Sequence, residues 1–294
     1  MKETYFAKLH PAVGFAFFMA AICTAVLVQH PAYLAASLLG ALCLNISLMG
    51  ARALKRFAQQ LPLWALLSAI NPLLNTRGAR VLFTCFGRPY TWEALCYGMA
   101  IAGMFIAMLQ WFSAYNAVMT EDKFTYLFAA LAPSMALLLT TVLRLIPNLL
   151  RQARQILSAR RCVGLGGQGD ARQKLAGGMA ALSVLTSWAL EGSVVTADSM
   201  NSRGYGAGRR SCFHSYAFKA ADIAAAAFLA LLLAAALTAL VGGGGAAEYT
   251  PEMLIAPIAG KNLWGLAAYA LFLLTPSLLD LKEDIQWHIS RSGI

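Results

Sequence analysis

The sequence predicts an all-α polytopic membrane protein with about six transmembrane helices, and three observations support this prediction. Of the 294 residues, 59% are hydrophobic and 12% are charged, whereas an average soluble domain is roughly 45–50% apolar and about 25% charged. Long uncharged runs occupy most of the chain, and most of the net charge of +10 falls in one central segment. A chain with so few polar groups requires lipid as the solvent for most of its surface.

Eight uncharged runs are candidates for membrane helices, each of which needs about 20 mainly apolar residues. They occupy residues 12–28, 31–50, 57–75, 94–120, 124–143, 175–190, 223–247 and 263–279. The first is interpreted as a membrane helix rather than a signal peptide, because a second run follows almost at once. A Gln-His-Pro turn joins these two runs into a predicted helical hairpin. Lys and Arg flank both ends of the hairpin, which are therefore expected in the cytoplasm.

Between the third and fourth runs, residues 81–91 predict a β-hairpin, with two short β-prone stretches around Gly87, Arg88 and Pro89. Near the other end of the chain, two spans are predicted at about 223–241 and 263–280. The four glycines at 242–245 should break the first of these spans. The charged tail from Asp280 onward is expected in the cytoplasm.

The central segment, residues 144–219, holds eleven Lys and Arg residues against three acids. It is therefore expected in the cytoplasm, lying against the membrane or a partner. A plain positive-inside loop is the simpler interpretation, but more than 70 residues is long for a loop. If this segment is inside, one of the runs 57–75 and 124–143 does not span. Hydropathy leaves that choice open.

The sequence contains no catalytic or metal-binding pattern. The six cysteines form no Cys-x-x-Cys pair and are interpreted as small buried hydrophobic residues. The four histidines are scattered, so no metal site is predicted. No Gly-x-x-x-x-Gly-Lys-Ser/Thr, Ser/His/Asp or His-Glu-x-x-His arrangement is present, so the chain should not hydrolyse ATP itself. Acidic residues are almost absent from the apolar runs, which argues against a stand-alone secondary transporter.

Residues 164–169 match Gly-x-Gly-x-x-Gly, but a nucleotide site needs this motif between a strand and a helix. A basic helical stretch precedes it here, so a flexible linker is the preferred interpretation. No cofactor is predicted. The basic charge is assigned to the membrane topology rather than to nucleic acid binding.

Two helical stretches of the basic segment are predicted to end on glycine, a usual helix stop. The first runs from residue 143 to Gly164, and the second ends at Gly204, with Arg203 directly before it. An arginine at a helix end can bind carboxylates or carbonyls of another protein through its guanidinium fork. It can equally complement the helix dipole, and the residues alone leave both interpretations open.

Four stretches resemble, in order and spacing, the motifs of the transmembrane T component of energy-coupling-factor (ECF) transporters, the EcfT/CbiQ-type family. They are Asn71-Pro72-Leu73 with Arg77-Gly78, Thr91-x-Glu93-Ala94-Leu95-x-Tyr97-Gly98, Leu143-Arg144-Leu145-Ile146-Pro147 and Ser202-Arg203-Gly204-Tyr205. The resemblance covers nearly the whole chain. The two motif glycines, Gly164 and Gly204, are 40 residues apart, about the spacing of the family.

One motif departs from the family pattern. The first Ala-Arg-Gly motif should fall at 162–164, where this chain has Cys162-Val163-Gly164. Arg160 and Arg161 lie one turn earlier. In the family each motif docks into one ATPase subunit, so the unequal motifs suggest two non-identical ATPases.

The resemblance implies a topology that settles which run does not span. The run 57–75 then spans, the β-hairpin is outside, and 124–143 is an apolar coupling helix under the membrane. Residues 1–120 form N-terminal transmembrane helices, 121–219 form a cytoplasmic coupling-helix domain, and 220–294 form the C-terminal transmembrane helices and a cytoplasmic tail. Both termini are inside. Arg77, Arg80 and Arg88 then lie outside, against the positive-inside trend.

The resemblance also implies a non-catalytic subunit of an ABC-type importer in the cell membrane. Its expected partners are two ABC-type ATPase subunits, a membrane-embedded substrate-binding S component and the lipid bilayer. The residues expected at the ATPase contacts are Ser202, Arg203, Gly204, Arg160, Arg161 and Gly164, and Arg144 and Pro147 belong to the coupling helix. The alternative is a stand-alone permease or a lipid-interacting protein whose basic segment binds anionic lipid. A membrane-bound enzyme is a third class, without a candidate site.

Overall fold

The computed structural model describes residues 4–75, 78, 80–85, 88–129, 132–164, 171–208, 216–249 and 253–292. The chain divides into two compact units, which are described separately. Residues 1–124 and 216–294 form one unit, here called the bundle, and residues 125–215 form the other, here called the central unit. The central unit runs from residue 125 to residue 215. The coupling-helix domain implied by the resemblance has the slightly wider bounds 121–219.

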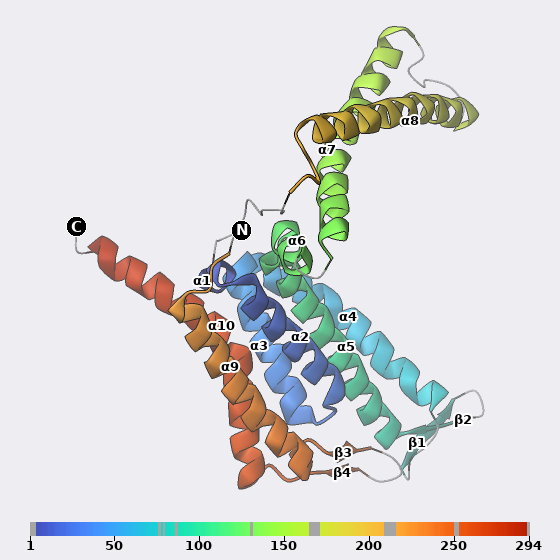
Figure 1. The fold of residues 1–294 in the computed structure, drawn as a ribbon. Coiled ribbons are helices and arrows are strands. Elements are labelled where there is room, and N and C mark those ends of the chain that lie inside the picture. The colour runs from blue at the N-terminus through green and yellow to red at the C-terminus, as the bar shows by residue number, and fades with distance from the viewer. Residues whose placement is uncertain are drawn as a thin grey trace. The chain divides into compact units, whose positions relative to one another are not determined.

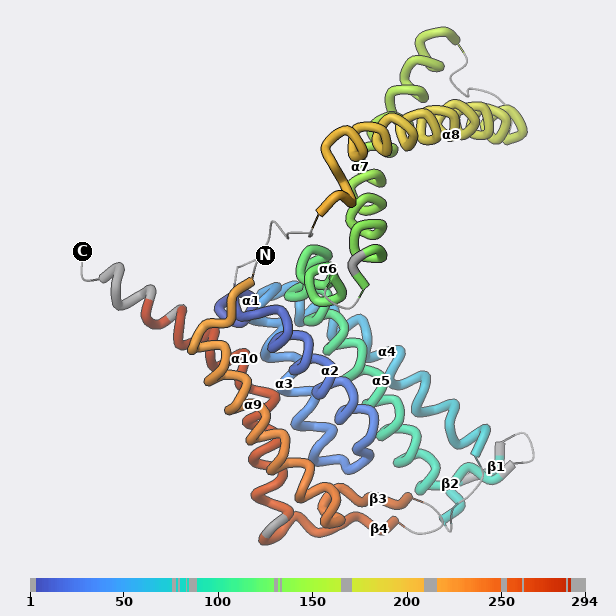
Figure 2. The backbone as a smooth tube through the Cα atoms, viewed as in Figure 1, coloured from blue at the N-terminus to red at the C-terminus, as the bar shows by residue number. Residues whose placement is uncertain are grey.

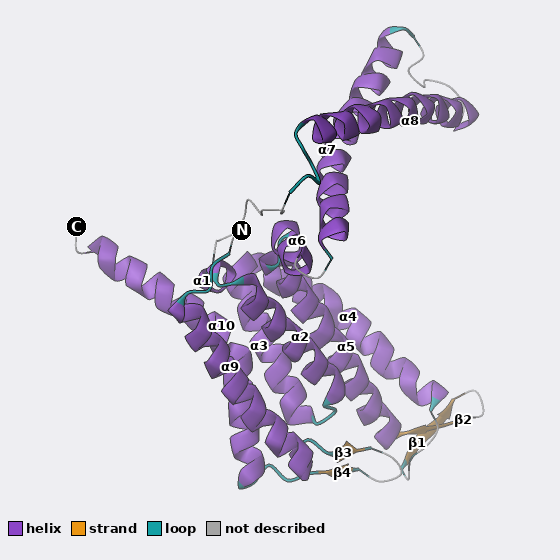
Figure 3. Ribbon diagram, in the orientation of Figure 1, coloured by secondary structure: helices purple, strands orange, loops and turns teal. Residues whose placement is uncertain are grey.

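The bundle is built from helices that begin and end on local signals (Figures 1 and 3). They are α1 (Tyr5–Lys8), α2 (Pro11–Leu27), α3 (Pro31–Met49), α4 (Ala51–Leu74), α5 (Trp92–Val118), α9 (Ala220–Ala239) and α10 (Lys261–Ser292), with α6 (Glu121–Ala129) starting at its edge. Both α2 and α3 open with His-Pro-Ala. In each, the histidine ring accepts the N–H of the alanine, and proline takes the first helical position. Proline suits that position because its missing N–H is not needed there.

Helices α2 and α3 are joined by a turn of only three residues, which confirms the predicted helical hairpin. The chain then passes directly from α3 into α4 through Gly50, whose φ of 62° favours glycine (Figure 2). Helix α3 packs against α5 and α10, α4 packs against α5, and α9 packs against α10. Because these contacts connect both ends of the sequence, the bundle needs its N- and C-terminal helices together.

Aromatic rings and close helix approaches make the core of the bundle. Phe17, Phe18, Trp111 and Phe272 are almost fully buried, and their rings meet at centroid distances of 5.0–6.4 Å. Gly40 lets α3 approach α10 closely, since a Cβ on it would stand 2.9 Å from the Cβ of Leu273. In a membrane the hydrophobic effect does not drive helices together. Small residues at such crossings allow the close van der Waals packing that does.

The β-hairpin predicted at 81–91 is confirmed. Strand β1 (Val81–Cys85) pairs antiparallel with β2 (Arg88–Thr91). Arg88 and Pro89 were expected in the turn, but they pair with Cys85 and Thr84 and belong to β2. Proline is tolerated there because an edge strand need not use every N–H.

The tetraglycine break is also confirmed. Helix α9 ends in a π-helical turn, Leu240–Gly244, in which Gly243 has a φ of 88°. A short antiparallel pair, β3 (Ala247–Glu248) with β4 (Leu254–Ile255), follows. The glycines free the chain to leave the helix and turn back toward α10.

In the described part of the chain, six helices are long and apolar enough to cross a membrane. Four of them, α3, α5, α9 with its π turn, and α10, are among the six spans that the resemblance implied. Helix α2 is apolar but has 17 residues, and α4 does not meet the same criteria. The other two are α7 (Pro133–Cys162) and α8 (Ala171–Ser202) of the central unit. Their assignment as non-spanning coupling helices stays a prediction.

The apolar run 124–143 is not one helix, which corrects the sequence analysis. Helix α6 ends at Ala129, and a new helix, α7, begins at Pro133 and continues through Pro147 to Cys162. Proline at 133 lacks the N–H that would continue α6, and it is favoured at the start of a helix. The first part of the run therefore belongs to α6, and the rest is the first part of a 30-residue helix.

The interpretation of the cysteines as buried residues was wrong for those whose side chains the structure describes. Cys23 and Cys43 are exposed on α2 and α3, Cys162 is exposed at the end of α7, and Cys96 is partly covered. In a membrane protein the outer face of a helix meets lipid, so a small apolar thiol does not need the protein interior. Cys212 lies outside the described residues.

Candidate docking site on the central helices

The central unit contains the helix pair that carries the predicted docking residues. Helices α7 and α8 pack against each other, and each ends a few residues before a glycine. Pro147 lies inside α7 and is exposed, as is Arg144 one turn earlier. Proline removes one backbone hydrogen bond from the helix, yet α7 continues for 15 residues beyond it.

The end of α8 is a glycine-closed Schellman turn. Gly204 has a φ of 74°, its N–H donates to the carbonyl of Asn201 at 2.9 Å, and the N–H of Tyr205 donates to the carbonyl of Met200 at 3.0 Å. These two bonds define the motif, with glycine in the left-handed position. The predicted stop of this helix on Gly204 is confirmed.

The end of α7 shares the left-handed glycine and the first of these two hydrogen bonds. Gly164 has a φ of 78°, and its N–H donates to the carbonyl of Arg161 at 3.1 Å, as the N–H of Gly204 does to Asn201. The predicted stop on Gly164 is therefore also confirmed. The remainder of the Gly-x-Gly-x-x-Gly sequence, residues 165–170, lies outside the described residues.

The three residues of the second motif are all exposed, but they are not equally available. The hydroxyl of Ser202 donates back to the carbonyl of Asp198 at 2.9 Å, so its proton is used within α8. Arg203 and Gly204 are exposed, and nothing lies within 4 Å of where a Cβ on Gly204 would stand. Arg203 and the open backbone of Gly204 are thus the accessible part of this end.

The two arginines near the first motif differ in a way that the sequence could not show. Arg161 is exposed, whereas Arg160 is partly covered. One guanidinium nitrogen of Arg160 lies 3.7 Å from the position of a Cβ on Gly177 of α8. Arg160 therefore packs between the two helices through its long side chain, and Arg161 is the accessible cation of this end.

A basic face of α7 was missed in the sequence analysis. Four exposed arginines recur at spacings of seven, three and seven residues, which places them along one side of a helix. They are Arg144, Arg151, Arg154 and Arg161. Exposed leucines, including Leu150 and Leu157, lie beside them. The helical spacing of these arginines is visible in the sequence, but only the number of charges in residues 144–219 was considered there.

The first two motif stretches have a packing role in the bundle. Glu93 is 5% exposed, and both of its carboxylate oxygens accept the N–H of Arg80 at 3.2 Å. Gly78 fits against this carboxylate, since a Cβ on it would stand 2.7 Å from Glu93 Oε2. Likewise, a Cβ on Gly98 would stand 2.7 Å from the carbonyl oxygen of Ser68. These residues hold the β-hairpin and α5 against the end of α4.

A second buried polar group joins three helices of the bundle. The side-chain amide of Asn45 donates to the backbone and side-chain oxygens of Gln110 at 2.9 and 3.1 Å, and Gln110 donates to Gln60 at 2.7 Å. Such amides connect α3, α5 and α4 in an apolar surrounding. Among the described residues no group of three or more His, Cys, Asp or Glu side chains could hold a metal ion.

Taken together, the helices define the class of this molecule: it is an all-α polytopic membrane protein with a separate central helical unit. No protein-family model matches the chain. No curated protein sequence is significantly similar to it.

Proposed function

We propose that this chain is the transmembrane coupling subunit of an ECF-type ABC importer. The observation that supports this most is the pair of central helices that both end on a left-handed glycine, each with an exposed arginine within three residues before it. Two equivalent helix ends on one chain suit a pair of related partners. The order of the sequence motifs along the chain agrees with this role.

In this proposal the partners are two ABC-type ATPases, docked at the ends of α7 and α8. Arg203 and Arg161 would bind carboxylates or carbonyls of the ATPases through their guanidinium forks. Because one end reads Cys162-Val163-Gly164 and the other Ser202-Arg203-Gly204, the two ATPases would be non-identical. ATP binding and hydrolysis would occur in these partners, and this chain would be non-catalytic.

The motion would pass from the ATPases to the substrate-binding membrane subunit. Closure of the ATPases would move α7 and α8, with Arg144 and Pro147 on the moving helix. The S component, held on apolar helix faces, would tilt and carry a vitamin or a metal ion inward. The chain would lie in the cell membrane, with its central unit and both termini in the cytoplasm, as the basic charge of that unit favours.

Purification of the tagged chain from its native cells in mild detergent, with the co-purifying chains identified by mass spectrometry, tests this proposal. Recovery of two different ATPase subunits and a small membrane protein is the expected result. A single kind of ATPase would contradict the non-identical partners alone. A chain that emerges without partners, under conditions in which known complexes survive, would contradict the coupling role.

A second candidate function is supported by the basic face of α7. Its four exposed arginines lie beside exposed leucines, an arrangement that suits anionic lipid headgroups next to acyl chains. In that case the chain would be a stand-alone permease or a lipid-interacting protein. Binding to anionic vesicles that falls steeply with salt and needs no protein partner would favour it.

A further inference from the structure

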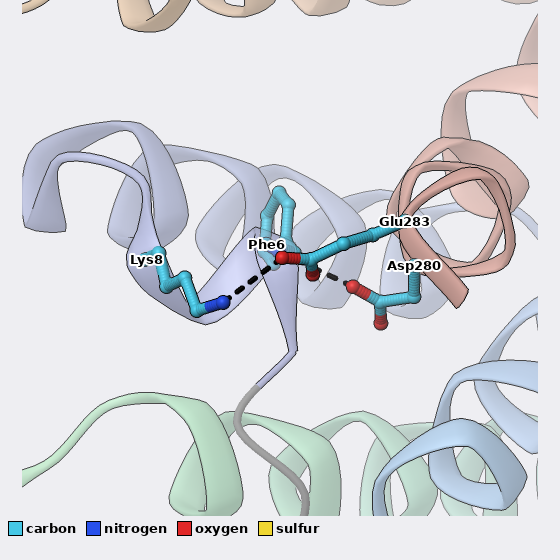
Figure 4. Close-up of polar contacts among 4 residues, drawn as sticks. All are labelled: Phe6, Lys8, Asp280 and Glu283. Carbon is cyan, nitrogen blue, oxygen red and sulfur yellow. Dashed lines mark hydrogen bonds and ion pairs between the residues drawn. The ribbon is translucent and has the colours of Figure 1, made fainter. Parts of the chain in front are cut away.

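The N-terminal segment Thr4–His10 is fastened to the C-terminal half of α10 through Asp280 and Glu283 (Figure 4). The backbone N–H of Phe6 donates to Oδ1 of Asp280 at 3.2 Å, and the ammonium of Lys8 donates to Oε1 of Glu283 at 2.9 Å. The first contact is buried and the second is exposed. The ring of Phe6 is buried against Phe17 of α2, with ring centroids 5.3 Å apart. The segment is therefore part of the bundle and not a loose terminus.

The same segment holds the chain just before α9 (Figure 2). Asp222 is 5% exposed and uses both carboxylate oxygens: Oδ1 accepts the N–H of His10 at 3.2 Å, and Oδ2 accepts the N–H of Lys219 at 2.9 Å. The ring of His10 stacks on Phe218 at a centroid distance of 3.7 Å and meets the edge of Tyr216 at 6.3 Å. A carboxylate that bridges two backbone donors from distant stretches fixes both of them in place.

The segment also holds the chain just after α5. The ammonium of Lys123 donates to the carbonyl of Ala7 at 2.5 Å and to the carbonyl of Val118 at 3.1 Å. Lys123 is at the start of α6, one residue before the bundle ends at Phe124. Tyr216, where the bundle resumes, lies against His10. The points at which the chain leaves and re-enters the bundle are thus both bound to seven residues of the N-terminus.

We propose that Thr4–His10 is a clasp that restrains the two connections to the central unit and joins them to the start of α9 and to the C-terminal half of α10. A linker such as 216–219, which is not helical, would otherwise absorb a displacement of α7 and α8 by bending. With the clasp closed, the displacement is delivered to α9 and α10. The clasp itself is independent of the transport role, whereas its use in coupling rests on the proposed function.

The first test measures whether the clasp is closed, by hydrogen–deuterium exchange of the full chain in nanodiscs. Asp222→Asn replaces one carboxylate oxygen by an amide group that cannot accept an N–H, and Lys123→Met keeps the apolar stem but removes the donor. In the double variant, exchange in peptides covering 5–12 and 216–222 should rise about tenfold, because local opening becomes easier. Peptides from α3 should not change. Lys282→Met, the same change at an exposed lysine of α10 that is not part of the clasp, is the matched control.

The second test measures whether the clasp restrains the central unit. Spin labels at the exposed positions Leu54 on α4 and Asp198 on α8, in a chain whose native cysteines are replaced, report the distance distribution between the two units. The double variant should broaden this distribution about twofold relative to the unsubstituted chain and to Lys282→Met. If the double variant does not accumulate, Phe218→Ala carries both tests, because Phe218 is 58% exposed and its removal leaves the core intact.

Raised exchange together with a broadened distribution is the expected result. Exchange that does not rise would show that the clasp is not closed, and raised exchange with an unchanged distribution would show that it does not restrain the central unit. Either result overturns the proposal. Failure to recover ATPase partners would overturn the coupling role and leave both measurements standing, so the two failures are distinguishable.

Discussion

Gly164 and Gly204, at the ends of α7 and α8, adopt the same left-handed backbone conformation, with φ of 78° and 74°. Around one glycine the chain reads Cys-Val-Gly, and around the other Ser-Arg-Gly. The shared feature is therefore the backbone geometry, and the difference lies in the side chains that it presents. If the ends dock on partners, the glycines set the shape of the contact and the arginines set its strength.

Replacement of Gly204 by alanine should distort the end of α8. A left-handed L-residue costs about 1–2 kcal/mol, and there is ample space for the methyl group, so strain and not a clash is the cause. Retention of the ATPase subunits in detergent should fall about tenfold, the equivalent of ~1.4 kcal/mol. Gly204→Asn should lose less, since asparagine tolerates this conformation better.

Gly208→Ala is the matched control for that experiment. Gly208 is exposed, a Cβ added to it would have no other atom within 4 Å, and it lacks the positive φ. Its retention of ATPase should be within about twofold of the unsubstituted chain, as for an ordinary surface substitution. Equal losses in Gly204→Ala and Gly208→Ala would refute a special role for the left-handed turn.

Charge reversal at Arg203 should uncouple transport and leave membrane insertion intact. Arg203→Glu would place a carboxylate against the acceptor groups of the partner, which is expected to lower substrate uptake about tenfold or more. Uptake in cells and the amount of chain in the membrane fraction are the two measurements. Arg172→Glu, at the exposed start of α8, controls for the loss of charge. Normal uptake in Arg203→Glu would rule out this residue as a docking point.

Arg160 and Arg161 should respond differently to substitution. Arg161→Glu is expected to weaken ATPase retention, because its side chain is exposed. Arg160→Met keeps an apolar side chain between α7 and α8 beside Gly177 and should change retention by less than about twofold. The contrast is measured by co-purification of both variants. The reverse order of effects would mean that the partner reaches Arg160 and not Arg161.

Features set by neighbouring residues were predictable from the sequence, and those set by distant contacts were not. The α2–α3 hairpin, the β-hairpin, the tetraglycine break and the stops at Gly164 and Gly204 follow from local turn and helix-end chemistry. The break before Pro133 was equally local, and a proline in an apolar run was overlooked there. The features that were predicted and the break that was overlooked each depend on only a few adjacent residues.

The contact between His10 and Asp222 joins positions 212 residues apart. No sequence pattern predicts this contact, because a single aspartate near the start of a helix is already explained as a helix cap. Asp222 does cap α9 by accepting from Lys219, and only the packing of α2 beside α9 adds the second donor. The difference between Arg160 and Arg161 has the same origin, since it depends on where α8 lies.

Alanine at Gly98 should destabilise the bundle. Its Cβ would stand 2.7 Å from the carbonyl of Ser68 and 2.8 Å from the Cβ of Asn71, so α4 and α5 would have to separate. Overpacking of this kind costs about 1–3 kcal/mol, which thermal denaturation in detergent should detect as a lower Tm. Gly14→Ala is the control, because its nearest neighbour would be the sulfur of Met119 at 3.8 Å, an ordinary contact. A Tm no lower for Gly98→Ala than for Gly14→Ala would contradict this packing.

The pH dependence of stability should reveal the burial of Lys123. Burial lowers the pKa of the Lys123 ammonium below its ordinary value of 10.5, because the charged form loses hydration in the folded chain. The unfolded chain then binds this proton more tightly, so the contribution of Lys123 to stability rises as the pH increases through the folded pKa toward 10.5. Lys123→Met has no such group. The Tm of the unsubstituted chain minus that of Lys123→Met should therefore increase between neutral and alkaline pH. Taking the difference cancels the other lysines and tyrosines that titrate in the same range. A difference that decreases with pH would mean that the carbonyls of Ala7 and Val118 stabilise the charged form by more than burial disfavours it.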